Sequence, residues 1–180
     1  MKKQQGFSLI EVSIVAVAVT AALGVLLAIG AQINQRSKID EVVQAVSIYT
    51  NLVAGDSKGQ ATKAYTSAQL AALPNVPQAW VDTSVVPAIA MWPWRTPVTA
   101  TTTSATGIGT RMDTVRLELT GLDVAVCEGA LPMVASRATR LTNTAALSVK
   151  AHANDPATSA EITALCAAAP STPILVEISM

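Results

Sequence analysis

The chain has 180 residues, of which 51% are hydrophobic and 13% are charged, and its twelve Lys and Arg balance its twelve Asp and Glu. A formal net charge of zero gives no overall electrostatic attraction to nucleic acid or to a membrane surface. One His and two distant Cys do not make a metal-ligand set, so we expect no metal and no other cofactor. The length suits one domain of modest core beside an N-terminal helix.

The first thirty residues hold a short basic leader and a long apolar run. Lys2 and Lys3 precede the sequence Gly-Phe-Ser-Leu-Ile-Glu at residues 6–11, and residues 12–31 are almost entirely apolar. About 20 residues that rise about 1.5 Å each cover the ~30 Å hydrocarbon core of a bilayer, so this segment is long enough to cross a membrane. A carboxylate in such a helix costs about 2.5 to 3.5 kcal/mol at the centre and less towards an end. We therefore expect Glu11 to have a partner.

Two ordinary interpretations of this segment are a secretory signal peptide and a plain membrane anchor. A signal peptide is cleaved after a small-residue site such as Ala16-Val17-Ala18, but its apolar region is usually only about 7 to 15 residues long. A plain anchor explains the length and the basic flank. It leaves Glu11 and the junction of Gly6 with Phe7 unexplained.

The order of residues 6–11, behind a basic leader and ahead of an apolar helix, resembles the class III signal of type IV pilins and pseudopilins. This resemblance implies that residues 1–6 are a leader peptide, which a prepilin peptidase removes by cutting after Gly6 on the cytoplasmic side. It also implies that the new amino group of Phe7 is N-methylated and that the apolar helix stays on the mature protein. Glu11 then becomes the fifth mature residue, the position that this family uses in filament assembly.

Elementary electrostatics supports the same role for Glu11. A carboxylate in an apolar medium favours an opposite charge, and a bundle of identical helices offers the cationic amino group of a neighbour's Phe7. Removing one partner from such a buried pair typically costs about 3 to 5 kcal/mol, although the intact pair contributes much less. We expect the pair to set the register between copies more than the strength of their association.

The helix is expected to continue beyond the membrane-length segment. Its further apolar residues recur at the three-and-four spacing of an amphipathic helix, namely Ile39, Val42 or Val43, Val46, Tyr49 and Val53. No proline occurs from Phe7 to Ala54, and Gly-Asp-Ser-Lys-Gly at residues 55–59 supplies the stop. We predict one helix over residues 7–54, about 70 Å long, with residues 7–31 as membrane anchor and filament core. Gly24 and Gly30 permit either a bend or close helix packing.

Residues 55–180 are predicted to form a globular head of α+β class, in which a small, mostly antiparallel sheet packs on the amphipathic half of the long helix. Three helices are expected, at Ser67–Leu73 after a cap at Thr66 or Ser67, at Leu122–Met133, and from Thr158 or Ser159 to Ala168. Strands are expected at Thr114–Leu119, Ala145–Val149 and from Ile174 onwards. The proline-containing residues 75–97 read mostly as loop, and residues 98–110 as an edge strand or a surface loop.

Cys127 and Cys166 are the only cysteines. Because the head is expected to be exported to an oxidising compartment, an even pair indicates one disulfide, with two buried thiols as the alternative. Closing a loop of about 40 residues stabilises a fold by about 4 kcal/mol in the chain-entropy model.

The C-terminal third is similar to type IVb pilins. Leu119-Thr120-Gly121-Leu122 followed by Cys127, and Cys166 ahead of a last strand, carry this second resemblance. It implies that the disulfide bounds an exposed, variable region. A six-residue leader and a mature chain beginning with Phe7 are more typical of the type IVa branch. Residues 92–96 are Trp-Pro-Trp-Arg-Thr where several type IVb relatives carry Asn-Pro-Trp-Gly-Gly, so the local turn is expected to differ.

Several other residues suggest sites. Trp92 and Trp94 fit either an adhesive or subunit-contact patch or, the preferred interpretation, burial against the sheet or helix. His152 is expected to be solvated, and Gly107-Ile108-Gly109 lacks the third glycine of a phosphate-binding loop.

The resemblance implies a structural subunit, the major pilin, of an extracellular type IV pilus, with roles in adhesion, aggregation or conjugation. The alternative is a minor pilin or a type II secretion pseudopilin. The expected partners are copies of this chain in a helical filament, the prepilin peptidase and the assembly machinery of the bacterial inner membrane. The precursor would cross that membrane once with its N-terminus in the cytoplasm. An enzyme is not expected, because the chain has one His and no Gly-x-Ser-x-Gly motif.

Overall fold

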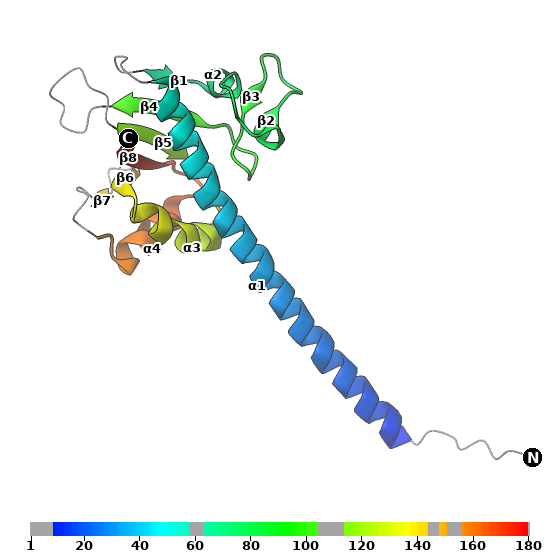
Figure 1. Ribbon diagram of the computed structural model, residues 1–180. Helices are drawn as coiled ribbons and strands as arrows, with labels where there is room; N and C mark the ends of the chain where they lie inside the picture. The colour runs from blue at the N-terminus through cyan, green and yellow to red at the C-terminus, as the bar shows by residue number, and fades with distance from the viewer. Residues whose placement is uncertain (1–8, 58–62, 104–113, 144–147, 151–155, 180) are drawn as a thin grey trace, which may run out of the picture. The chain divides into compact units, whose positions relative to one another are not determined.

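The computed structural model describes residues 9–57, 63–103, 114–143, 148–150 and 156–179, and the side chains of residues 9–12, 14, 103 and 148–150 lie outside this description. The chain divides into two compact units, Met1–Ser37 and Lys38–Met180. One uninterrupted helix, α1 (Leu9–Asp56), belongs to both units (Figure 1). The fold is mixed α+β, as predicted.

The second half of α1 carries the predicted apolar stripe. Val42, Val46, Tyr49 and Val53 are buried, and Ala45 joins them on the same face. Their spacing of three, four and seven residues places them on one side of a helix with 3.6 residues per turn. The helix ends at Asp56, two residues beyond the predicted end.

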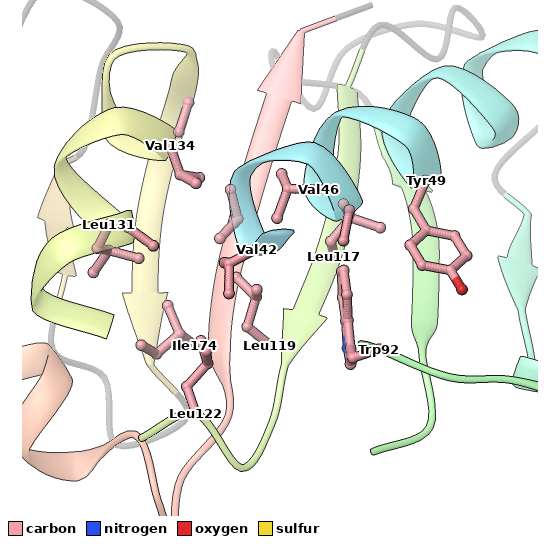
Figure 2. Packing of buried hydrophobic residues seen from close by; sticks show 14 of the residues in the cluster. Val42, Val46, Tyr49, Trp92, Leu117, Leu119, Leu122, Leu131, Val134 and Ile174 are labelled. Carbon is pink, nitrogen blue, oxygen red and sulfur yellow. The ribbon is translucent and has the colours of Figure 1, made fainter. Parts of the chain in front are cut away.

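A six-stranded antiparallel sheet faces this stripe (Figure 2). Its strand order is β1-β4-β5-β8-β6-β7. The strands are β1 (Ala64–Tyr65), β4 (Thr99–Thr103), β5 (Thr114–Leu119), β8 (Ile174–Ser179), β6 (Ala138–Asn143) and β7 (Ser148–Lys150). The predicted strand at residues 114–119 is confirmed as β5, and the last predicted strand as β8.

Alternation of side chains fixes the register of the two central strands. Leu117 of β5 lies opposite Val176 of β8, and both are fully buried on the core face. Between these apolar pairs Arg116 lies opposite Glu177, and the Arg116 Nε donates a hydrogen bond of 2.8 Å to the Glu177 carboxylate. A shift of one residue would exchange the two faces, so the apolar pattern specifies this pairing.

Two helices connect the strands of the C-terminal half. They are α3 (Val124–Ala135), capped by the Asp123 side chain, and α4 (Ser159–Ala168), capped by Thr158. The helix predicted at Leu122–Met133 begins and ends two residues later, as α3. Pro132 lies in the last turn on the exposed side, where the loss of one backbone donor is tolerated more easily than in a buried helix interior.

The prediction of strands between these helices was incomplete. β6 (Ala138–Asn143) was not predicted, because only Leu141 and the small Ala138 are apolar on its inner face. The strand predicted at residues 145–149 overlaps β7, and residues 144–147 lie outside the described chain. Cross-strand pairing with the central β8 therefore creates β6 despite its weak pattern.

Residues 66–98 hold short elements that precede β4. Helix α2 (Ser67–Ala71) begins with a capping box between Thr66 and Gln69. The 3₁₀ helix η1 (Gln78–Trp80) leads into a hairpin of β2 (Val81–Asp82) and β3 (Ile89–Ala90), which Figure 1 shows beside α2. The expectation of loop with short extended pieces is confirmed here. The edge-strand expectation is corrected for Thr99–Thr103, because β4 lies between β1 and β5, while residues 104–110 lie outside the described chain.

Candidate functional site

The residues predicted to take part in processing and assembly are Gly6, Phe7 and Glu11. Gly6 and Phe7 lie outside the described residues, and so does the side chain of Glu11. The backbone of Glu11 belongs to the first described turn of α1, which begins at Leu9. Cleavage after Gly6, methylation of Phe7 and pairing of Glu11 thus stay predictions.

The N-terminal part of α1 is long and apolar enough to cross a membrane. Its large apolar side chains are exposed at successive positions, so that no single face is reserved for the protein's own core. They include Val15, Val17, Val19, Leu23, Val25, Leu26, Leu27, Ile29 and Ile33. A helix that is apolar all round requires an apolar environment on every side, either lipid or other helices.

The helix also provides hydrogen-bond partners for a polar side chain that could find none in lipid. The Thr20 hydroxyl lies 3.0 Å from the carbonyl oxygens of both Ala16 and Val17, to which it can donate. Such back-bonding removes the cost of an unpaired hydroxyl in hydrocarbon. The backbone continues as α-helix through Gly24 and Gly30, and a Cβ added at either glycine would meet no atom within 4 Å.

The predicted disulfide is present. Cys127 of α3 and Cys166 of α4 are bonded to each other across 39 residues, and their Cα atoms are 5.6 Å apart. Both residues are fully buried, so the bond joins the two helices within the core. It constrains the C-terminal region, whose loop of about 40 residues corresponds to about 4 kcal/mol in the chain-entropy model.

A polar clasp holds the end of α1 to the sheet. The Lys63 ammonium lies 2.6 Å from the Asp56 carboxylate, and the Tyr65 hydroxyl donates to the same oxygen at 2.8 Å. The hydrogen bond to Asp56 raises the pKa of Lys63 above its ordinary value. No local pattern in the sequence predicts this clasp, which joins Asp56 to residues seven and nine positions further along the chain.

The tryptophans are chiefly structural. Trp92 is fully buried, and its indole nitrogen donates to the Glu118 carbonyl at 3.0 Å. Trp94 is half-buried, stacks on Trp92 at a centroid distance of 5.0 Å, and donates to the Thr120 carbonyl. The Tyr49 ring of α1 meets Trp92 edge-on at 5.2 Å. The preferred interpretation, burial, is thus confirmed for Trp92, while His152 and residues 107–109 lie outside the described chain.

The arrangement offers anchoring and packing surfaces. In the part of the chain that the structure describes, no group of three or more His, Cys, Asp or Glu side chains is placed to hold a metal ion. Every buried side-chain nitrogen or oxygen within those same ranges has a hydrogen-bond partner. Comparison with protein-family models, with curated proteins and with solved structures finds no match to this chain.

Proposed function

We propose that this chain is the structural subunit of an extracellular type IV pilus. It is made as a precursor that crosses the bacterial inner membrane once, with the N-terminus in the cytoplasm. A prepilin peptidase then cuts after Gly6 and the amino group of Phe7 is methylated. The processed copies polymerise through their N-terminal helices into a filament.

One combination of features carries this proposal. The motif at residues 6–11 stands directly ahead of a helix that is apolar and unburied on all sides in its first part. The same helix is buried on one face only in its second part, where Val42, Val46 and Tyr49 pack on the sheet. A secretory signal would be removed, and a plain anchor would need neither the continuous helix nor the motif.

In the proposed assembly the apolar segment of α1 occupies two apolar environments in turn. Before assembly its environment is lipid, and after assembly it is the same segment of neighbouring copies. Packing one face of a subunit on a different face of the next generates an open helix whenever the rotation does not close. Glu11 would pair with the Phe7 amine of a neighbour and set the axial register.

Mass spectrometry of the protein from sheared surface filaments tests the processing step. We expect a mature chain that begins at Phe7 and carries one methyl group on its amine. An intact leader, or cleavage at any other bond, would contradict the proposal. High abundance in those filaments would identify the major subunit, whereas scarcity would favour the minor-pilin alternative.

The role of Glu11 is tested by Glu11→Ala, expressed without the wild type. We expect normal cleavage but few filaments, because a neighbour's amine is left unpaired in an apolar environment, at a cost of about 3 to 5 kcal/mol. Glu41→Ala is the matched control, since Glu41 lies in the same helix and is exposed. A normal filament yield from Glu11→Ala would count against charge pairing.

A further inference from the structure

The loop that joins β2 to β3 presents an unusual apolar tip. Val86 is 94% exposed and its neighbour Val85 is 45% exposed. In the described residues of the Lys38–Met180 unit, the other exposed large hydrophobic residues are Val124 and Met133 of α3. Single exposed valines are common, but two adjacent ones on a short hairpin make a small projecting apolar surface.

This tip is held in a defined conformation at its base. The Asp82 carboxylate accepts hydrogen bonds from the backbone N–H of Ser84 at 2.9 Å and from its hydroxyl at 2.6 Å. The hydrogen bonds from Ser84, with a smaller contribution from the charge of Arg95, lower the pKa of Asp82 below its ordinary value. The base of the apolar tip therefore carries a negative charge at neutral pH.

A groove with complementary properties lies elsewhere on the same unit, between α1, the end of α3 and the end of β8. Its volume is about 180 Å³. Val46 of α1 and Val134 of α3, both labelled in Figure 2, form part of its apolar wall, and the half-exposed Met133 also lines it. A cavity of about 150 Å³ admits a benzene-sized group, so this groove has room for a valine side chain.

The groove carries a positive charge. Arg137 is the only charged residue among those that line it, and it forms no ion pair with any residue in the described ranges. The tip thus combines valines with one carboxylate, and the groove combines an apolar wall with one guanidinium. The two surfaces therefore match in polarity and in the sign of these charges.

We propose that the β2–β3 tip of one copy of this chain docks in the α1–α3 groove of a second copy. The two surfaces lie on different parts of the head. Figure 1 shows the β2–β3 hairpin beside α2, whereas the residues that line the groove belong to α1, β8 and the end of α3. A docked pair therefore keeps one free tip and one free groove, so the contact continues from copy to copy and gives an open helix whenever the rotation does not close. This inference rests on the proposed polymer, in which it supplies a head-to-head contact in addition to the helix core.

Engineered cysteines test the contact in the full chain. Both native cysteines are in the disulfide, so introduced thiols have no native free thiol to react with. Filament-bearing cells that express Val86→Cys/Met133→Cys are treated with a short bismaleimide and the proteins are separated on a denaturing gel. We expect a ladder of dimers, trimers and higher species. Cells that co-express the two single variants should give dimers only.

Val86→Cys/Val124→Cys is the matched control. Val124 is also an exposed apolar residue of α3, but it lies nine residues before Met133, or roughly 13 Å along the helix. We expect no ladder from this pair, and loss of most of the ladder when Arg137→Glu is added to the first pair. Intact filaments without a Val86–Met133 ladder, or an equal ladder with Val124, would overturn the contact and leave the pilus proposal standing. Absence of any surface polymer from the wild type would overturn both.

Discussion

The two halves of α1 have the same backbone conformation and opposite relations to the rest of the chain. In the first half, apolar side chains such as Val25 and Leu27 are exposed. In the second half, Val42 and Val46 are buried against the sheet, and charged or polar residues such as Glu41 and Gln44 are exposed. The difference shows that a helical backbone alone does not indicate whether its side chains face lipid, other helices or a protein core. The width of the apolar surface distinguishes a helix made for lipid or for its own copies from one made for a core.

The same substitution should have very different effects in the two halves of α1. Val46→Asp places a charge without a partner in the core, which costs at least about 3 to 5 kcal/mol. A typical free energy of unfolding is only about 5 to 15 kcal/mol. We expect the head to be unfolded or nearly so. Val25→Asp should leave the head's melting temperature unchanged and weaken membrane insertion by about 2.5 to 3.5 kcal/mol.

Circular dichroism of the full chain in detergent micelles measures the melting temperature of each variant. Carbonate extraction of membranes measures the insertion. A fall in melting temperature of similar size in both variants would show that the first half also packs on the head.

The space around the glycines differs between α3 and the first half of α1, and the expected effects of substitution are smaller. A Cβ at Gly129 of α3 would lie 2.3 Å from the Cδ1 atom of Ile39, whereas a Cβ at Gly24 would meet nothing within 4 Å. We expect Gly129→Ala to destabilise the head by about 1 to 3 kcal/mol through overpacking. Gly24→Ala should leave the head unaffected, because alanine only improves helix propensity there, by up to about 1 kcal/mol.

Ile39→Val removes the nearest clashing atom and supplies the control for this steric explanation. In denaturant unfolding, the Gly129→Ala/Ile39→Val double variant should be more stable than the sum of the two single changes predicts. Additive effects would mean that the cost of Gly129→Ala arises elsewhere.

The smallest expected effect concerns a helix cap within the head. The Glu161 carboxylate accepts hydrogen bonds from the hydroxyl and the N–H of Thr158, and these bonds lower the pKa of Glu161 below its ordinary value of 4.5. Its contribution to stability is therefore complete above about pH 4.5 and is lost as the pH falls through the lowered pKa. Glu161→Gln keeps a residue able to form the capping box but does not titrate. The wild type should lose its small advantage in melting temperature over this variant at low pH, and a difference constant with pH would contradict the assignment.

Much of the fold follows from local patterns in the sequence. The stripe on α1, the alternation in β5 and β8, and the paired cysteines each indicate one arrangement, and the structure contains all of them. These patterns are strong because one buried face repeats over several turns or strand positions.

The remainder depends on contacts that no local pattern records. β6 exists through its pairing with β8, and the two-residue strands β2 and β3 are too short to show alternation. Gly129 and Ile39, which approach each other closely, are 90 positions apart in the chain. The candidate site was predicted from residue order alone, and of its members the structure describes only the disulfide with its side chains.

The position of β8 has a consequence for biogenesis. β8 lies between β5 and β6 in the six-stranded sheet, although it is the last strand along the chain that the structure describes. The central ladder therefore cannot close until residues up to Ser179 have left the ribosome. The apolar segment of α1 is made before them. If that segment enters a membrane as proposed, it can do so before the sheet of the head is complete.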